Sequence, residues 1–508
     1  MSPGEPQARG IDRLLATRNN RGVTTPIGLN RTALVVLSAT VLVSVMNASM
    51  TSVALPDLQR DFAVGADDLT WVITAYLIPF ATGTVIYGRL ADMFGTRPMY
   101  ILGLSLFAVA SLAVALSPEF GIVVATRAVQ GAGGTAVPAL SLATIVRTTT
   151  TANRGPAMGV MILAVGLGFA AGPLVGGALT EWAGWRGPFY FTAIAALLLL
   201  PAALRSVPGV PGTSGQRFDY AGALLLTGAV TGTLLALNRL PRTPGDLLGL
   251  GGLTAAIPLW PLLGWRILHA SEPFIDPSVV KNRRFMGLSV VGMTTQGGHF
   301  AVIVLVPLLL ASVHEMGVMR IGLHLLPGAL ALGFFGMAGG RLTNRVGNGA
   351  LMIAGSATVF GSALVFHIEG VDWPSWGISL FYVALASGYG MVNAAGMNAA
   401  TSELPEEVAG VGVGVFNLAF FLGGAVTVAL VGAILRARET AGDAFNPLFD
   451  GGAVAYSDAM LVVVGFTLIG FVLSLLLGPS GARSRARKEE DGEGRPAFAR
   501  ESEPGGSK

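Results

Sequence analysis

One arginine and two histidines stand away from the ends of long apolar segments of this 508-residue chain. They are Arg127, His299 and His324. A charge at mid-membrane costs at least about 2.5 to 3.5 kcal/mol on insertion scales, so we expect Arg127 to face a polar cavity. Histidine changes its charge near neutral pH, so each imidazole is a candidate to carry a proton.

No acidic residue lies at the middle of an apolar segment, because all 29 fall in tails, loops or segment ends. Burial raises the pKa of a carboxyl group, which suits such a group to proton transfer. Its absence leaves His299 and His324 as first candidates, with Asp57, Glu181 and Glu407 in reserve. A lone membrane histidine also serves as a hydrogen-bonded packing residue, and that alternative stays open.

The composition indicates an integral membrane protein. Hydrophobic residues make up 52% of the chain and charged residues only 12%, against roughly 25% in soluble domains. With no cysteine and five scattered histidines, we expect no catalytic residues, no metal site and no cofactor. The net charge of +3 is too small for us to expect a nucleic-acid partner.

Fourteen stretches have the length of about 20 residues that crosses a bilayer. They are 32–55, 69–88, 98–117, 119–143, 156–180, 187–206, 218–238, 246–268, 284–311, 319–341, 348–366, 374–400, 409–435 and 455–478. The third and fourth stretches are separated only by Ser117-Pro118-Glu119, and the seventh and eighth are interrupted by glycine and proline, so counts of twelve or thirteen stay open. An even number is favoured by the charge distribution of the loops and tails.

If the N-terminus is cytoplasmic, 24 of the 32 lysines and arginines lie inside, and six lie outside. This asymmetry obeys the positive-inside rule. The sequence therefore predicts a multi-pass membrane protein with both termini in the cytoplasm. That the membrane is the bacterial cytoplasmic one is implied only by the family resemblance of its motifs.

Two nearly identical turns divide the chain into related halves. Gly88-Arg89-Leu90-Ala91-Asp92-Met93-Phe94-Gly95 follows the second stretch, and Gly340-Arg341-Leu342-Thr343-Asn344-Arg345-Val346-Gly347 follows the tenth. Repeated helix bundles are typical of secondary transporters. We expect a cytoplasmic tail (1–31), a six-helix bundle (32–206), a linker with two extra helices (207–282), a second six-helix bundle (283–478) and a disordered cytoplasmic tail (479–508).

In the first turn, the residues expected to act as a gate are Gly88, Arg89, Asp92, Gly95 and Arg97. Asp92 is suited to accept hydrogen bonds from a helix N-terminus or to pair with an arginine of the neighbouring bundle. The second copy has Asn344 in place of Asp92, so a latch there would lack a formal negative charge.

The fifth stretch carries glycines at helical spacing around one proline. The pattern G-x8-G-x3-GP-x2-GG comprises Gly159, Gly168, Gly172, Pro173, Gly176 and Gly177. The glycines at 168, 172 and 176 share one helix face, which predicts a smooth groove for a neighbouring helix, and Pro173 predicts a bend. Generic glycine packing is the simpler alternative.

These patterns resemble the major facilitator superfamily. The turn G-x-L-A-D-x-x-G-x-R is similar to that family's loop motif, and Arg127-Ala128-Val129-Gln130-Gly131 is similar to its R-x-x-Q-G element. The glycine pattern and the fourteen segments resemble the drug and proton antiporter branch, which includes Gram-positive tetracycline exporters and actinomycete self-resistance pumps. The resemblance implies an all-α major facilitator fold of two pseudo-symmetric six-helix bundles plus two inserted helices, and a proton-transfer role for Arg127.

The chain departs from this branch at the first stretch, where Asn47 occupies the place of an acid. The departure favours a neutral, zwitterionic or anionic cargo. Further residues expected at a substrate cavity are Trp71, Tyr76, Gln130, Gln296, Asn393, Asn398, Asn417 and Phe420. Each is also a plausible helix-packing residue.

We therefore expect a monomeric secondary exporter of a hydrophobic or amphipathic small molecule, driven by proton antiport through rocker-switch alternating access. Its partners would be that small-molecule substrate, protons and the lipid bilayer. A same-fold importer or facilitator, a polytopic membrane enzyme and a non-transporting sensor are the competing interpretations.

Overall fold

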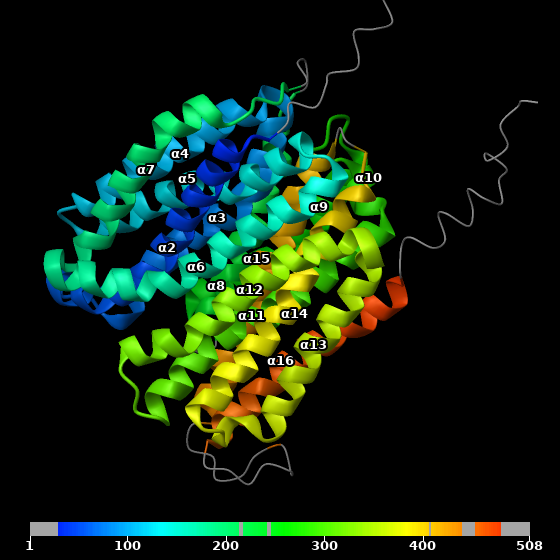
Figure 1. Cartoon of the computed structure of the whole chain (residues 1–508). Helices are drawn as coiled ribbons and strands as arrows, with labels where there is room; N and C mark the ends of the chain where they lie inside the picture. The colour runs from blue at the N-terminus through cyan, green and yellow to red at the C-terminus, as the bar shows by residue number, and fades with distance from the viewer. Residues whose placement is uncertain are drawn as a thin grey trace, which may run out of the picture.

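The computed structural model describes residues 29–212, 217–240, 245–405, 408–438, 445 and 453–478. Glu407, residues 1–28 of the predicted N-terminal tail and the whole predicted C-terminal tail (479–508) lie outside this part of the chain. The described chain begins and ends at the same end of the molecule (Figure 1).

The described residues form fourteen helices of 20 residues or more, which confirms the predicted all-helical membrane fold. They are α2 (Arg31–Phe62), α3 (Ala66–Phe94), α4 (Thr96–Ala115), α5 (Phe120–Thr148), α6 (Thr151–Ala183), α7 (Gly187–Ser206), α8 (Tyr220–Arg239), α9 (Leu247–His269), α11 (Arg283–Ser312), α12 (Val318–Val346), α13 (Asn348–Ile368), α14 (Ser375–Ser402), α15 (Ala409–Ala437) and α16 (Val454–Leu477). Three short elements join them, namely η1 (Gly184–Arg186), α10 (Pro277–Lys281) and η2 (Gly370–Asp372). The turn η1 almost fuses α6 and α7, so hydropathy alone finds thirteen spans among the described residues.

The pattern of helix neighbours repeats between the halves. In the first half α2 packs on α6 and α7, α5 on α3 and α4, and α4 on α7. The second half repeats this with α11 on α15 and α16, α14 on α12 and α13, and α13 on α16. Between the halves, α6 lies along α12, and α3 lies along α15 (Figure 1). These two contacts are also related by the repeat, and we call them the α6–α12 seam and the α3–α15 seam.

Both seams are built on glycine. A methyl group on Gly155 would lie 2.0 Å from the Gly340 carbonyl oxygen, and one on Gly88 would lie 2.8 Å from the Gly410 carbonyl oxygen. Within a membrane, such close backbone approach replaces the hydrophobic drive that packs helices in water. The first glycine of each duplicated turn is therefore a contact point between the halves.

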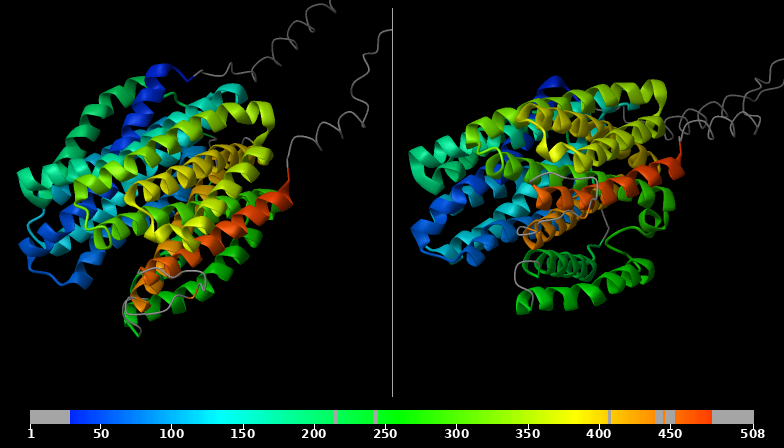
Figure 2. Two further views of the ribbon diagram at one scale, coloured as in Figure 1. Left: turned by 60° about the horizontal axis from the view of Figure 1, so that its bottom comes forward. Right: turned by 90° about the horizontal axis from the view of Figure 1, so that it is seen from below.

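Helices α8 and α9 form a hairpin beside the main bundle (Figure 2). Helix α8 contacts both α3 and α15, so the hairpin borders the α3–α15 seam. Asp219 ties its ends together, accepting hydrogen bonds from Arg266 at 2.6 Å and from the backbone N–H groups of Gly222 and Phe274 at 2.9 and 3.2 Å. Burial opposes ionisation of Asp219, yet these hydrogen bonds hold the pKa of its carboxyl below the usual value.

Helix α5 offers a matched test of the glycine packing. A methyl group on Gly133 would lie 2.4 Å from the Phe107 backbone nitrogen of α4, whereas one on Gly121 meets nothing within 4 Å. We expect Gly133→Ala to lower the free energy of unfolding by roughly 1–3 kcal/mol through overpacking. Gly121→Ala should leave stability unchanged or raise it. Thermal unfolding of the purified protein, followed by tryptophan fluorescence, measures both; equal melting temperatures would contradict this packing.

Candidate functional site

Arg127 lies at the centre of the first half, 1% exposed. Its Nε donates to the Val72 carbonyl at 2.9 Å, and its Nη1 donates to the side-chain oxygens of Asn47 at 3.2 Å and Gln130 at 2.5 Å. The guanidinium also lies over the Tyr76 ring, 4.2 Å from the centroid. Arg127 thus connects α5 to α2 and α3.

The hydrogen bonds continue outward from these partners. Gln130 donates to the Ser111 hydroxyl of α4 at 2.7 Å, and Asn47 donates to the Thr192 hydroxyl of α7 at 3.1 Å. Helices α2, α3, α4, α5 and α7 are therefore joined around one cation, which we call the Arg127 cluster. Its described partners are neutral, so oriented dipoles and an aromatic face stabilise the charge in place of a carboxylate.

Asp92 of the first turn accepts a hydrogen bond from Arg147 at the end of α5, in its own half. Its carboxylate also lies against the backbone N–H of Val411 in the first turn of α15, in the other half. A methyl group on Gly410 would come within 2.3 Å of the Asp92 carboxylate. A carboxylate is stabilised at a helix N-terminus, so this contact links Asp92 to the other half. Its arginine partner, Arg147, belongs to its own half and not to the neighbouring bundle, and the sequence argument did not name it.

Two other residues of the turn have local roles. Gly95 has a φ of +93°, which favours glycine and allows the turn between α3 and α4. Arg97 donates to the Leu204 carbonyl at the end of α7. Arg89 lies at the same end of α3, one residue beyond the seam contact at Gly88.

The glycines of α6 serve two different neighbours. Gly168, Gly172 and Gly176 face α2, where added methyl groups would meet Val45, Ser49 and Met50. Gly159 faces Met337 of α12 across the seam. The predicted groove therefore exists within the first half, and α6 also carries one face of the contact between halves. Gly177 borders Val53 of α2, and Pro173 lies inside a helix that remains continuous.

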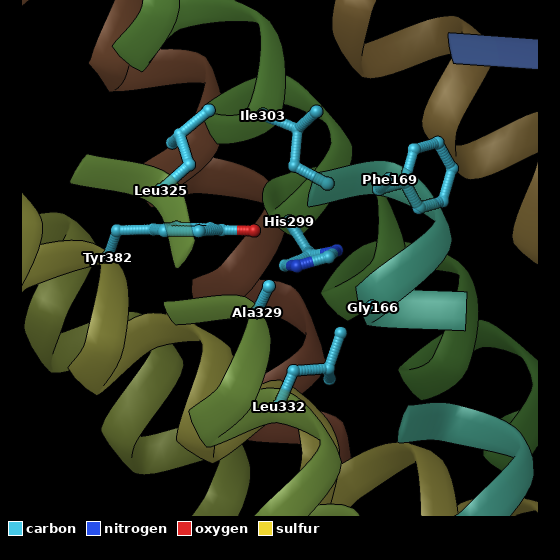
Figure 3. A pocket seen from close by; sticks show the side chains of 8 residues that line it. All are labelled: Gly166, Phe169, His299, Ile303, Leu325, Ala329, Leu332 and Tyr382. Carbon is cyan, nitrogen blue, oxygen red and sulfur yellow. The ribbon is translucent and has the colours of Figure 1, made fainter. Parts of the chain in front are cut away.

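His299 of α11 is buried at the interface of the halves, 2% exposed. Neither ring nitrogen has a hydrogen-bond partner in the described part of the chain. The ring borders a small cavity of about 30 Å³ (Figure 3). The pocket is lined by Gly166, Phe169, His299, Ile303, Leu325, Ala329, Leu332 and Tyr382, from α6, α11, α12 and α14.

Aromatic and amide groups of α14 support this imidazole. It stacks on Tyr389 with ring centroids 4.1 Å apart, and Tyr382 lies nearly parallel to it at 6.1 Å. The Tyr389 hydroxyl donates to the Gln296 side chain and accepts from Asn393 at 2.8 Å. Two expected cavity residues, Gln296 and Asn393, are thus brought together beside His299.

The remaining expected residues lie elsewhere. His324 places Nδ1 2.9 Å from the Arg320 carbonyl of its own helix, and Asn398 donates to Asn348 of α13 at 3.0 Å. Phe420 packs against Gly292 of α11, and Trp71 lies under Arg239 of α8 at 5.2 Å. Asn417 is half-buried on α15. Of the reserve acids, Asp57 pairs with Arg60, and Glu181 is exposed.

Comparison with known proteins identifies the family. Residues 37–428 match the sequence model of the Major Facilitator Superfamily. The chain belongs to this superfamily. It is 28% identical to the multidrug resistance protein Stp of Mycobacterium tuberculosis, over 80% of this chain and 77% of Stp. It is also 28% identical to the tetracenomycin C resistance and export protein of Streptomyces glaucescens, over 81% and 77% of the two chains.

A solved superfamily structure, that of the human organic anion transporter MFSD10, matches with a TM-score of 0.62 at 16% identity. The match covers 88% of this chain and 99% of MFSD10 and supports the fold. The protein is therefore a multi-pass membrane transporter of the major facilitator superfamily, and not an enzyme. Its relatives include drug and antibiotic resistance exporters.

Arg127→Lys tests the cluster in this superfamily member. An ammonium keeps the charge but cannot present the flat fork that reaches Val72, Asn47 and Gln130 together. Hydrogen bonds to a charged group contribute about 1.5–3 kcal/mol each, so we expect transport to fall at least about tenfold. Drug susceptibility at matched membrane expression measures it. Unchanged resistance would show that charge alone suffices.

Asp92→Asn tests the contact between halves, and the cysteine-free chain permits a single reporter thiol. Thr84→Cys places that thiol at a buried position whose native hydroxyl donates to the Gly414 carbonyl across the α3–α15 seam. We expect Asp92→Asn to destabilise the closed seam by about 1 kcal/mol, which should raise the rate at which maleimide labels the reporter thiol about fivefold. Asp57→Asn, which removes an exposed ion pair, is the control. Equal labelling rates in Asp92→Asn and Asp57→Asn would contradict a stabilising contact of Asp92 across the α3–α15 seam.

Proposed function

We propose that this protein exports a hydrophobic or amphipathic small molecule from the cytoplasm by proton antiport, through alternating access. The observation that carries the proposal is the pair of symmetry-related glycine seams, which join the halves at the end that holds the duplicated turns. The relatives that confer resistance to antibiotics support the direction of transport and the class of cargo.

The sidedness follows from the charges of the loops. The duplicated turns carry Arg89, Arg97, Arg341 and Arg345, and the positive-inside rule places such loops in the cytoplasm. Seams closed at this end correspond to a state shut toward the cytoplasm. Separation of the same seams, with closure at the opposite end, would produce the other state.

His299 is the better of the two proton candidates. It is buried at the interface, and neither ring nitrogen has a described hydrogen-bond partner, so protonation of the imidazole breaks no described hydrogen bond. His324 already contacts the carbonyl of Arg320 on its own helix. The Arg127 cluster holds a charge that its neutral partners stabilise, so it is suited to organise the first half while His299 titrates.

The test is accumulation of tetracenomycin C in an exporter-deficient bacterial host that expresses the protein. Export driven by the proton gradient predicts low accumulation in energised cells and a rise to the level of empty-vector cells when a protonophore is added. An importer would show the opposite change. Accumulation that stays unchanged with and without the protein, for this drug and for a panel of amphipathic antibiotics, would contradict export.

The same assay separates the two histidines. We expect His299→Gln to abolish the protonophore-sensitive fraction of export and His324→Gln to retain it, because glutamine cannot change its charge. Surface expression of both variants is measured in the same cells. Full coupling in His299→Gln would remove this histidine from the proton pathway.

A further inference from the structure

We infer that the acidic segment 489–493 of the C-terminal tail binds an arginine surface at the end of the α6–α12 seam that carries the duplicated turn, and that the bound segment holds this seam closed. The arginine surface consists of Arg31 on α2 and of Arg341 and Arg345 on α12, all exposed. The closing role rests on the proposed alternating access, whereas the binding is measured without transport.

Two of the arginines come from the second half. Arg341 directly follows Gly340, whose backbone lies against Gly155 of α6 at the seam. Arg345 lies one helical turn further along α12, so it is on the same face as Arg341. The second half thus presents two exposed cations beside the contact between the halves.

The third arginine comes from the first half and lies at the same level. Helices α2 and α6 run parallel, and the Ser38 hydroxyl contacts the Met161 sulfur at 3.5 Å. Arg31 lies seven residues, or about two turns, before Ser38, and the residue seven before Met161 directly precedes Gly155. Arg31 is therefore level with the glycine contact, one helix away from the seam.

These three cations lack a partner in the described part of the chain. None of their guanidinium groups forms an ion pair or a hydrogen bond with another described residue. The described carboxylates at this end all have partners elsewhere, and they are Asp92, Asp219, Glu272, Asp276 and Glu403. A surface that gathers cations without acids attracts an anion.

The internal repeat shows which group is missing from this seam. At the α3–α15 seam, Asp92 lies against the N-terminus of α15 and accepts a hydrogen bond from Arg147. The second copy of the turn has Asn344 at the corresponding position. The α6–α12 seam therefore has cations but no carboxylate from its own turn, and an acidic segment from elsewhere in the chain would supply one.

The C-terminal tail leaves the bundle close to this surface. Helix α16 ends at Leu477 and packs along α13, where the hydroxyls of Ser474 and Ser356 share a hydrogen bond of 2.7 Å. Helix α13 begins directly after the turn that holds Arg345. The tail thus starts two helices away from the arginines of α12.

The length of chain between α16 and the acids covers this distance. Neighbouring helices lie about 8–10 Å apart, so the path from α16 over α13 to α12 is roughly 20 Å. Residue 489 lies 11 positions beyond Gly478. A chain of that length reaches at most about 36–40 Å, and roughly 17–20 Å on average when it is flexible. A segment tethered at this range binds at an effective concentration on the order of millimolar.

Charge selects the segment and explains how it closes the seam. The sequence of 489–493 is E-E-D-G-E, and arginine pairs with carboxylates through two parallel hydrogen bonds. The preceding cations at 483, 485, 487 and 488 are repelled by the same surface, so the acids are the part of the tail that fits. A segment bound to Arg31 and Arg341 together joins the two halves, and separation of the seam would break one of these pairs.

Spin-label distances between Asn153→Cys and Gly492→Cys in the full-length purified protein test the binding. Asn153 is exposed on α6 beside the seam, and Gly492 lies within the segment without carrying a charge. We expect a short-distance population in nanodiscs of phosphatidylcholine, which has no net charge. That population should fall at least about threefold at high salt, which screens exposed charges, and in the neutralised segment Glu489→Gln, Glu490→Gln, Asp491→Asn and Glu493→Gln.

A charge-matched pair of variants locates the surface. Arg31→Gln with Arg341→Gln should reduce the short-distance population at least about threefold. Arg217→Gln with Lys281→Gln removes the same charge from exposed positions beside the helix hairpin and should retain that population. An unchanged distance distribution in the first pair, or an equal loss in both pairs, would overturn the inference. Loss of the population when phosphatidylglycerol is added would assign the surface to anionic lipid and would also overturn it.

A buried thiol measures the closing role. Ile162 of α6 is 7% exposed and packs against Gly336 of α12, so Ile162→Cys reacts with maleimide only when the seam opens. The neutralised segment should raise its labelling rate at least about twofold, and an equal rate would overturn the closing role. Export that persists without the tail contact would overturn this inference alone. Loss of export in the native protein, with the distances unchanged, would overturn the proposed function and leave the binding in place.

Discussion

Close contact of glycine backbones is the constraint on which this structure depends. Lipid removes the hydrophobic drive that packs helices in water, so helices must approach until their backbones touch. Gly155 on Gly340 and Gly88 on Gly410 provide that approach at two symmetry-related seams. A contact made from smooth backbone surfaces separates without dismantling interlocked side chains, which suits a transporter that must open there.

The two halves treat buried polar groups differently. In the first half, every helix except α6 contributes to the hydrogen-bonded cluster around Arg127, so the bundle has a fixed polar centre. In the second half, His299 lies unsatisfied beside the seam. A satisfied network gives rigidity, whereas an unsatisfied group awaits a proton or a ligand. The helix left out of the cluster, α6, is the one that lines the His299 pocket.

Much of the architecture could be predicted from the chain. Apolar runs located the fourteen helices, and the duplicated turns predicted a division into two halves. The glycine spacing on α6 predicted a groove. Helix α2 fills most of that groove, and Gly159 is the one glycine of the motif that faces α12 instead. Segment ends were less predictable from the apolar runs. Helix α2 continues to Phe62 instead of ending at residue 55, because contacts between helices extend beyond the hydrocarbon layer of the membrane.

The site was only partly predictable. Arg127 and His299 stood out because each is polar in an apolar run. Gln130 follows Arg127 by three residues, but the other partners, Val72 and Asn47 of Arg127 and Tyr389 of His299, are distant in sequence. Tyr389 lies one helical turn before Asn393, a spacing that places both on one face of α14 and was the available signal. Trp71 and Phe420 illustrate the converse, since the helix hairpin and α11 occupy their surroundings.

Spin-label distance measurement across the α6–α12 seam tests the central claim most directly. The chain has no cysteine, so Asn153→Cys and Arg341→Cys, both exposed beside the glycine contact, provide a unique labelled pair. The account predicts a short-distance population and a second, longer one, with proportions that change between pH 8 and pH 5. A single short distance at both pH values, in protein active for export, would contradict a seam that opens.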